Sequence, residues 1–305
     1  MVTELTPHPA DGRRGVLAAL AAYVLWGLTP LFWPLLGDSS AVEVLAHRYI
    51  WSSVMALGLG LILGVRWWQV LRRRRTMIVL SVAALLISVN WGTYIWAVNN
   101  QHALDAALGY YINPLLSVVA GVVLLRERLS PLRWLAVGVA LVGVTWMTIQ
   151  LGQVPWVALV LATSFAIYGV IKKRIRVEPI ATMTIESLLI TPFALAFLIW
   201  LAVIGQGGFA TKGLGYSLLF VATGAMSLTP LLLFAIAAQK ISLFAIGMLQ
   251  YIAPTAQMLI GIYYLGEPMS PSRLMGFAVV WVALVIVSID SLLAVRRQRR
   301  LRRAG

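Results

Sequence analysis

The stretch that decides the fold is LGYYINPLLSVVAGVVLLRERLSPLR, from Leu108 to Arg133. It returns in altered form as MLQYIAPTAQMLIGIYYLGEPMSPSR, from Met248 to Arg273. The two stretches share a Tyr-Ile-Xaa-Pro segment, a glutamate 13 residues after the proline, and a Ser-Pro pair, all at an offset of 140 residues. Agreement at so many positions without a gap indicates two copies of one unit. An earlier match, YVLWG at 23–27 with FAIYG at 165–169, extends the repeat towards the start of each copy.

The composition is typical of a protein that lies in lipid. Of the 305 residues, 61% are hydrophobic and 11% are charged, whereas soluble domains carry about 25% charged residues. The net charge of +14 does not indicate a nucleic-acid partner, because the basic residues stand in short runs between apolar segments. The absence of cysteine excludes disulfides, thiolate metal ligands and cysteine nucleophiles. The polar N-terminal residues lack a small-residue cleavage pattern, so we expect no removable signal peptide.

Ten apolar segments of the chain are long enough to cross a bilayer, which takes about 20 mostly apolar residues. We expect the spans at 14–36, 42–65, 75–98, 103–125, 131–149, 155–171, 181–204, 214–238, 242–266 and 271–295. The sequence therefore predicts an all-α integral membrane protein made of two five-helix units. The units comprise residues 1–150 and 151–305, and the second ends in a basic tail.

Lysine and arginine predict the orientation, because they are retained on the cytoplasmic side of short loops. With the N-terminus in the cytoplasm, 21 of the 24 basic residues fall on the inner side, Lys212 and Arg273 fall outside, and Arg48 falls within a span. Both termini are therefore expected in the cytoplasm. Because each unit has an odd number of spans, the two units should lie in opposite orientations as an inverted repeat. Their Tyr-Ile-Xaa-Pro segments should then come close together.

Several motifs together resemble those of one known family. They are YVLWGLTP at 23–30, HRYIWS at 47–52, NWGTYIWAVNN at 90–100, LGYYINPLLSVVAG at 108–121 and QYIAPT at 250–255. They resemble the RarD proteins, EamA-type members of the drug/metabolite transporter superfamily. The resemblance implies ten transmembrane helices in two inverted repeats, a central substrate cavity, alternating access and a place in the bacterial inner membrane. It also implies a chloramphenicol-permease-like activity as one candidate.

Matched helix breaks point to a binding site between the two units. We expect breaks at Asn90-Trp91-Gly92 and Ser227-Leu228-Thr229-Pro230, and at Pro114 and Pro254, because a proline frees a backbone carbonyl one turn earlier. A plain packing kink is the alternative at each proline. Amides and aromatic rings near these breaks suit a small neutral or zwitterionic organic molecule. The expected substrate-binding residues are Trp26, Arg48, Asn90, Trp91, Tyr94, Tyr110, Asn113, Tyr168 and Gln250.

Charged residues inside the spans are costly and therefore informative. Glu43 and His47 share one face of the second span, beside Arg48. Arg48 with His47 forms either a basic wall that attracts anionic or zwitterionic substrates, or a structural ion pair with Glu43. Glu43 and Glu186 are candidate proton-coupling groups. The residues expected in gating or coupling are Glu43, His47, Pro114, Glu186 and Pro254.

The sequence contains no recognisable enzyme or metal-site pattern. HExxH, GxSxG and nucleotide phosphate-binding motifs are absent, and the three histidines are far apart in sequence. We therefore predict a secondary-active or facilitative transporter of a small organic metabolite or drug, without cofactor or metal. Its partners would be the substrate, the lipid bilayer and, as a candidate coupling ion, the proton. The alternatives are a non-transporting membrane sensor or assembly partner, and an integral-membrane enzyme that acts on lipids.

Overall fold

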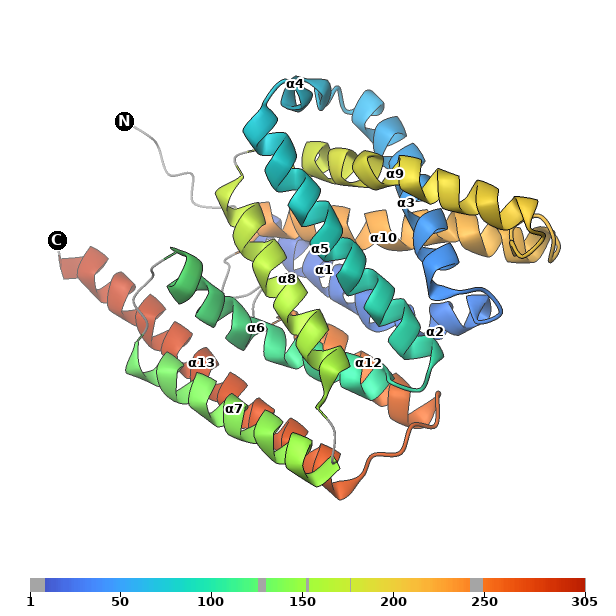
Figure 1. Ribbon diagram of the computed structural model, residues 1–305. Coiled ribbons are helices and arrows are strands. Elements are labelled where there is room, and N and C mark those ends of the chain that lie inside the picture. Colours follow the sequence, from blue (N-terminus) through green and yellow to red (C-terminus); the bar gives the residue numbers. More distant parts are fainter. Residues whose placement is uncertain (1–8, 126–129, 152–153, 176, 242–248, 305) are drawn as a thin grey trace.

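The computed structural model describes residues 9–125, 130–151, 154–175, 177–241 and 249–304, and these residues form helices and connections without a strand. Figure 1 shows the long helices running between the same two ends of the molecule. In chain order the elements are α1 (Pro9–Gly27), α2 (Thr29–Phe32), the 3-10 helix η1 (Trp33–Leu36), α3 (Ala41–Ile62), α4 (Trp68–Leu71), α5 (Arg74–Asn99), α6 (Ala103–Leu125), α7 (Pro131–Leu151), α8 (Trp156–Arg174), α9 (Pro179–Val203), α10 (Leu214–Lys240), α12 (Ile252–Tyr263) and α13 (Pro271–Ala304).

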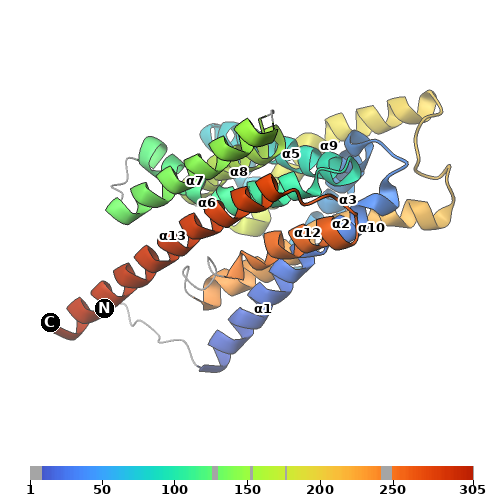
Figure 2. The ribbon, with the colours of Figure 1, turned by 90° about the horizontal axis from the view of Figure 1, so that it is seen from below.

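Six segments of the described chain are long and apolar enough to cross a membrane. They are Arg13–Leu36, Ala41–Ile62, Arg74–Asn99, Ile180–Val203, Leu214–Phe234 and Pro271–Asp290. Helix α1 begins and α13 ends at the same end of the molecule in both views (Figure 1 and Figure 2). Each of the expected spans has a helix at its position in the sequence, although residues 242–248 of one span lie outside the described chain.

The first expected span is not a single helix. Helix α1 ends at Gly27, and α2 and η1 follow it. The cause is Pro30, which has no N–H to donate to the carbonyl of Trp26, four residues earlier. That carbonyl instead accepts hydrogen bonds from the Thr29 hydroxyl at 2.6 Å and from Gln257 Nε2 at 3.1 Å.

The breaks expected at Asn90-Trp91-Gly92 and at Pro230 are wrong. Helices α5 and α10 run through both positions. In α10 the hydroxyl groups of Thr223 and Ser227 bond to backbone carbonyls in the turns before Pro230, and spanning helices tolerate a proline in such surroundings. Asn90 does not open α5, because its side chain bonds to the neighbouring helix α8 instead.

The two repeated prolines behave differently. Helix α6 is continuous through position 114, so the break expected there is also wrong, and the side chain of Pro114 lies outside the described part of the structure. Before α12, by contrast, the chain turns at Gln250 and Tyr251, within one helical turn of Pro254. Pro254 cannot donate to the carbonyl of Gln250, and this accounts for the late start of α12.

Contacts between the two halves of the chain come in matched pairs. If α1, α3, α5, α6 and α7 are exchanged with α8, α9, α10, α12 and α13, the α1–α10 contact becomes the α5–α8 contact, and the α6–α8 contact becomes the α1–α12 contact. The pairs α3–α9, α6–α12 and α7–α13 map onto themselves. These helix pairs are therefore preserved when the halves are exchanged, as expected of two copies of one unit, although the contact between α6 and α13 has no counterpart of similar extent between α12 and α7 among the described residues.

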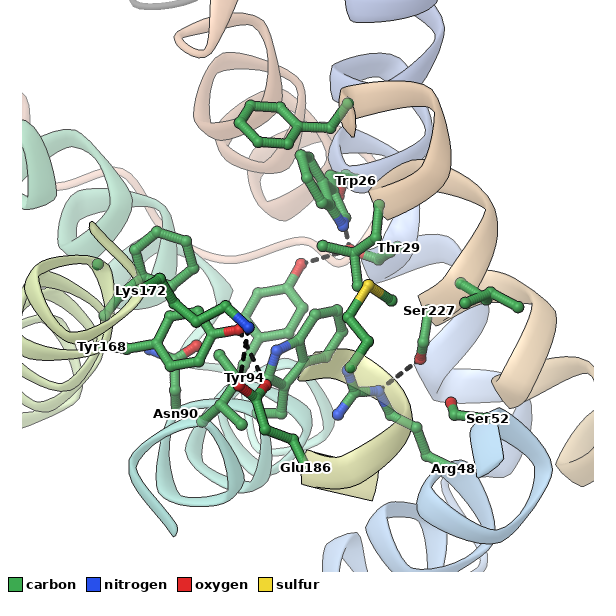
Figure 3. Close-up of a pocket in the computed structure, with 18 of the residues that line it drawn as sticks. Trp26, Thr29, Arg48, Ser52, Asn90, Tyr94, Tyr168, Lys172, Glu186 and Ser227 are labelled. Atoms are coloured by element: carbon green, nitrogen blue, oxygen red, sulfur yellow. Dashed lines mark hydrogen bonds and ion pairs between the residues drawn. The ribbon is translucent and has the colours of Figure 1, made fainter. Parts of the chain in front are cut away.

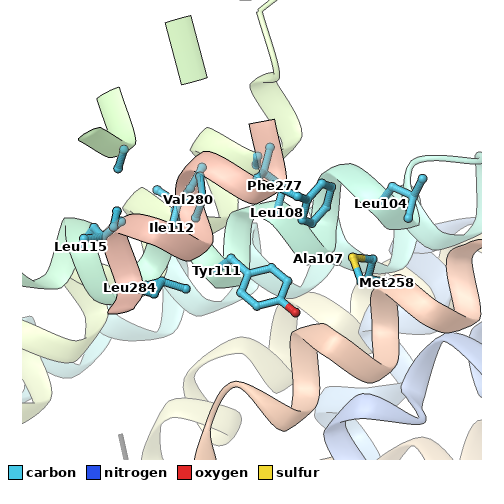
Figure 4. Packing of buried hydrophobic residues seen from close by; sticks show 14 of the residues in the cluster. Leu104, Ala107, Leu108, Tyr111, Ile112, Leu115, Met258, Phe277, Val280 and Leu284 are labelled. Carbon is cyan, nitrogen blue, oxygen red and sulfur yellow. The ribbon is translucent and has the colours of Figure 1, made fainter. Parts of the chain in front are cut away.

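The two repeated tyrosines meet in the largest buried apolar cluster. The rings of Tyr111 and Tyr251 are stacked, with centroids 6.5 Å apart, and the Tyr111 hydroxyl lies 2.6 Å from the hydroxyl of Thr255. Leu108, Phe277 and other apolar residues of α6, α12 and α13 surround Tyr111 (Figure 4). The expected proximity of the two Tyr-Ile-Xaa-Pro segments is confirmed.

Glu267, one of the two repeated glutamates, caps α6. Its carboxylate accepts hydrogen bonds from the backbone N–H groups of Ala103 at 2.5 Å and Leu104 at 2.9 Å, and the residue is buried. The first N–H groups of a helix have no partner within the helix, and a negative charge there is favoured by the helix dipole. Its counterpart in the repeat, Glu127, lies outside the described residues.

Replacing Glu267 by alanine should lower the free energy of unfolding by about 2 kcal/mol, because two buried N–H donors lose a charged acceptor. Thermal unfolding of the purified protein in detergent measures the change. Glu178→Ala is the matched control, since Glu178 is exposed at the start of α9 and makes no capping hydrogen bond. Equal losses in the two variants would contradict the capping role of Glu267.

Candidate functional site

A cavity of about 670 Å³ lies between the two halves of the chain, among α1, α3, α5, α6, α8, α9, α10 and α12 (Figure 3). Its volume lies within the range of small-molecule sites, about 300–1,000 Å³. At one end it reaches Lys172, Ile175 and Val177, at the end of α8 and in the connection to α9. None of its described lining residues comes from the connections at the opposite end of the helices. Among the described residues, the cavity therefore reaches the connection at the α8–α9 end and no connection at the other end.

The structure brings all of the expected substrate-binding residues to the wall of this cavity. They are Trp26, Arg48, Asn90, Trp91, Tyr94, Tyr110, Asn113, Tyr168 and Gln250. Of the residues expected in gating or coupling, Glu186 and Pro254 line the cavity, whereas Glu43 and His47 do not. Binding of a substrate by these residues remains a prediction.

The closed end of the cavity lies at the break between α1 and α2. Thr29 and Tyr94 join there through their hydroxyl groups, which are 2.8 Å apart. Gln257 of α12 donates to the Trp26 carbonyl that Pro30 frees. Both bonds connect the broken first span to other helices, so they hold this end of the cavity closed.

Arg48 enters the cavity from α3. Its Nε donates to the Ser227 hydroxyl of α10 at 2.5 Å, and its guanidinium carbon lies 3.5 Å from the ring centroid of Trp91. The residue is 6% exposed. Figure 3 shows it reaching across to Ser227 from beside Ser52. The site thus contains a guanidinium held by a neutral hydroxyl and an aromatic ring.

Asn90 forms part of the wall and holds α5 against α8. Its Nδ2 donates to the carbonyl of Leu161 at 2.8 Å and to the hydroxyl of Ser164 at 3.0 Å, and the residue is 1% exposed. The Tyr110 hydroxyl lies 3.5 Å from its Oδ1, at the limit of a hydrogen bond. The side-chain nitrogen of Asn90 is therefore engaged in hydrogen bonds that hold α5 against α8.

Lys172 and Glu186 form an ion pair at the open end. Lys172 Nζ lies 2.7 Å from Glu186 Oε1 and donates to the Thr182 hydroxyl at 2.6 Å. The Tyr168 hydroxyl donates to the other oxygen of Glu186 at 3.1 Å. Each carboxylate oxygen of Glu186 therefore has a partner, and both partners, Lys172 and Tyr168, come from α8 (Figure 3).

Glu43 and His47 lie near the opposite end and have structural partners. A carboxylate oxygen of Glu43 accepts from the backbone N–H of Gly208 at 2.6 Å. The His47 ring packs against Phe209 and Phe220, with centroids 4.9 and 4.2 Å away. The ion pair between Glu43 and Arg48, one of the two alternatives considered from the sequence, is not formed. Arg48 lies five positions later in α3 and so faces another direction.

Several cavity residues were missed by the sequence reasoning. They include Tyr23, Thr29, Ser52, Lys172, Ser227, Phe234 and Gln257. For two of them the spacing in the sequence could have predicted a place in the cavity wall. Gln257 follows Gln250 by seven positions and Ser52 follows Arg48 by four, so on the spans expected from the sequence each would share a helix face with a predicted residue. Lys172 is one of the basic residues at span ends that predict the orientation, and its position in the sequence gives no sign of a cavity.

Two stretches of the chain, residues 13–149 and 154–289, match the EamA-like transporter family. The chain belongs to this family. It is 46% identical to Protein RarD of Streptomyces exfoliatus, over 95% of this chain and 92% of that protein. It is 31% identical to the chloramphenicol-sensitive protein RarD of Pseudomonas aeruginosa, over 94% of this chain and 97% of that protein. A protein of known crystal structure has the same fold, with a TM-score of 0.61 at 21% identity over 90% of this chain and 97% of its own.

These relationships confirm the resemblance to RarD proteins. This EamA-like protein is a multi-pass membrane transporter of the bacterial inner membrane. The first family match ends at residue 149 and the second begins at residue 154, so each covers one half of the chain. The cavity of this EamA-like protein is lined from both halves.

Proposed function

We propose that this transporter moves a small organic metabolite or drug by alternating access between two inverted five-helix repeats, residues 1–150 and 151–305. The observation that carries the proposal is a cavity between the two halves whose described lining reaches the connections at one end of the helices and not those at the other. The proposal includes ten membrane spans and cytoplasmic termini. Transport is secondary-active or facilitative.

The open end of the cavity is assigned to the cytoplasm. Lys172, Lys173 and Arg174 lie at this end of the chain's sixth expected span, and short cytoplasmic loops retain such residues. The described conformation is then open to the inside. Its outer end is closed by the Gln257–Trp26 and Thr29–Tyr94 hydrogen bonds.

A matched pair of glycines supports the alternation. A methyl group at Gly27 would lie 2.7 Å from Cβ of Ala256, so α1 and α12 are in tight contact at the closed end. Gly169, its counterpart in the repeat, lines the cavity, and a methyl group there would meet no atom within 4 Å. If the two halves exchange conformations, Gly169 becomes the tight contact and Gly27 the open one. The cavity would then open to the outside.

The wall of the cavity suits a small organic molecule. Its lining contains aromatic rings together with the amides of Asn113, Gln250 and Gln257. Chloramphenicol is one candidate, because a relative is named for sensitivity to it. Protons are the candidate coupling ion, with Glu186 as the candidate coupling group.

Flux into proteoliposomes tests the proposal. Radiolabelled metabolites and chloramphenicol would be offered with and without a pH gradient. Asn113→Ala and Gln250→Ala should each lower flux about tenfold, which corresponds to the loss of one hydrogen bond to the substrate. Asn100→Ala is the matched control, because this amide is exposed at the end of α5, away from the cavity. Normal insertion with wild-type flux in both cavity variants would overturn the site.

A further inference from the structure

We propose that Arg48 receives the negative charge of the substrate, and that the substrate is an organic monoanion, a carboxylate with an apolar, ring-containing body. This inference rests on the transport function proposed above and names the class of molecule that the cavity carries. It differs from the neutral or zwitterionic substrate that the amides and rings of the sequence suggested. It selects the anion from the anionic or zwitterionic substrates that a basic wall of Arg48 and His47 would attract.

The first support is the lack of a counter-charge for Arg48. Its described partners are all neutral: the Ser227 hydroxyl, the face of the Trp91 ring and, at 5.7 Å, the ring of Tyr49. Among the residues that the structure describes, no carboxylate lies within ion-pair distance of it. A charged side chain near the middle of a membrane costs about 2.5–3.5 kcal/mol on insertion scales and is normally paired. Arg48 keeps its charge without such a pair, at the wall of the cavity.

The second support is the charge of the cavity as a whole. Apart from tyrosines, the ionisable residues among its described lining are Arg48, Lys172 and Glu186. Lys172 and Glu186 neutralise each other across 2.7 Å. One uncompensated positive charge remains, so the cavity attracts an anion and repels a cation. The ammonium group of a zwitterion would have to displace Lys172 from Glu186 to find a carboxylate.

The third support is a second donor next to Arg48. Ser52 follows Arg48 by one turn of α3 and lines the cavity. Its hydroxyl is buried and has no hydrogen-bond partner among the described residues. A guanidinium offers its N–H groups in a planar fork that matches a carboxylate, and a serine hydroxyl beside it adds one more donor. Figure 3 shows the two side chains next to each other.

The remainder of the wall selects an apolar body for this anion. The aromatic rings of Trp26, Tyr94, Tyr110, Tyr168 and Phe234 surround the space beyond Arg48. Aromatic rings favour offset or edge contacts with another ring. A volume of about 670 Å³ accommodates a molecule of one or two rings with a short acidic side chain.

Matched sets of ligands test the charge directly. The probes are phenylacetate, phenylacetamide and 2-phenylethylamine; indole-3-acetate, indole-3-acetamide and tryptamine; and L-phenylalanine as a zwitterion. Binding would be measured by the shift in thermal unfolding of the purified full-length protein, and flux in proteoliposomes. We expect the carboxylates to bind at least about tenfold more tightly than their amides, which corresponds to about 1.4 kcal/mol.

Substitutions then assign the preference to Arg48. Arg48→Gln should remove it by lowering carboxylate affinity about tenfold while leaving amide affinity within about twofold. Arg48→Lys should retain part of it, and Ser52→Ala should weaken carboxylate binding alone. Arg66→Gln, at an exposed arginine beyond the other end of α3, is the matched control and should change neither.

The outcomes separate the two proposals. Equal binding of amides and carboxylates, a preference for the amines or for phenylalanine, binding of no carboxylate, or unchanged carboxylate binding in Arg48→Gln would each overturn the inference. If Arg48→Gln unfolds, Arg48→Lys and Ser52→Ala still decide it. Carboxylate binding that depends on Arg48 but is never followed by flux would contradict the transport function and leave the anion site standing.

Discussion

Leucine at position 169 should leave the protein folded but hold the cavity open to the cytoplasm, so that transport is lost. In the described conformation a side chain at Gly169 meets open space. In the exchanged conformation proposed above, this position would pack as Gly27 does now, against a neighbouring helix. Overpacking a tight contact costs about 1–3 kcal/mol. A cost of that size lowers the population of the outward-open state, and therefore the flux, by about 5- to 150-fold.

Leucine at position 27 should have the opposite effect. It would meet Ala256 at once, so it separates α1 from α12 and opens the outer end. Because the chain has no cysteine, a single Leu231→Cys in the cavity wall reports the open side through its labelling by a membrane-impermeant maleimide. Labelling should come from the cytoplasmic side in Gly169→Leu and from the outer side in Gly27→Leu.

Gly138→Leu is the matched control for both glycines. Gly138 is exposed on α7, and a side chain there also meets no atom within 4 Å. Wild-type flux and wild-type labelling are expected from it. Identical labelling patterns in Gly27→Leu and Gly169→Leu would contradict the exchange of conformations between the two halves.

Methionine in place of Lys172 should destabilise the protein by about 3 kcal/mol. It leaves Glu186, whose side chain is 6% exposed, with the Tyr168 hydroxyl in place of a counter-charge. Breaking a buried pair costs about 3–5 kcal/mol, and the lower figure applies because the Lys172 side chain is 25% exposed. Glu186→Gln should cost less, since the ammonium group of Lys172 lies nearer to water. The double variant should recover part of the loss, and thermal unfolding of the three variants measures it.

The same variants address coupling. If Glu186 carries the coupling proton, flux in Glu186→Gln should no longer respond to a pH gradient across the proteoliposome membrane.

For the loss of stability in Lys172→Met, the matched control is Lys212→Met, because Lys212 lies 4.0 Å from Asp38 in an exposed pair, and exposed pairs contribute little to stability. Equal losses of stability in Lys172→Met and Lys212→Met would show that burial of the Lys172–Glu186 pair has no energetic consequence.

The contrast between Arg48 and Glu43 shows where inference from the sequence ended. Their separation in the chain allowed either an ion pair or a basic wall. The choice depended on Gly208 and Ser227, which are more than 150 residues away and which take the two side chains in different directions. Local periodicity cannot supply such partners.

The prolines illustrate the same limit. Pro30 frees a carbonyl that Gln257 uses, while Pro230 lies inside a continuous helix. Both prolines remove a backbone donor, as the sequence alone predicts. Whether the helix then ends or continues depends on the side chains that neighbouring helices and the preceding turns provide.

By itself the sequence determined the helical membrane class, the duplication and the set of polar residues expected in the cavity, because hydropathy, repeat spacing and the cost of polar groups in lipid are properties of the chain alone. Only the tertiary structure decided which of those residues have hydrogen-bond partners, which connections the cavity reaches, and that no carboxylate of the described residues lies within ion-pair distance of Arg48. The physical reason is that hydrogen bonds and ion pairs at this site join residues from different halves of the chain. The repeated stretches around Tyr111 and Tyr251 indicated that the chain has two halves, and the packing of these halves against each other forms the cavity between them.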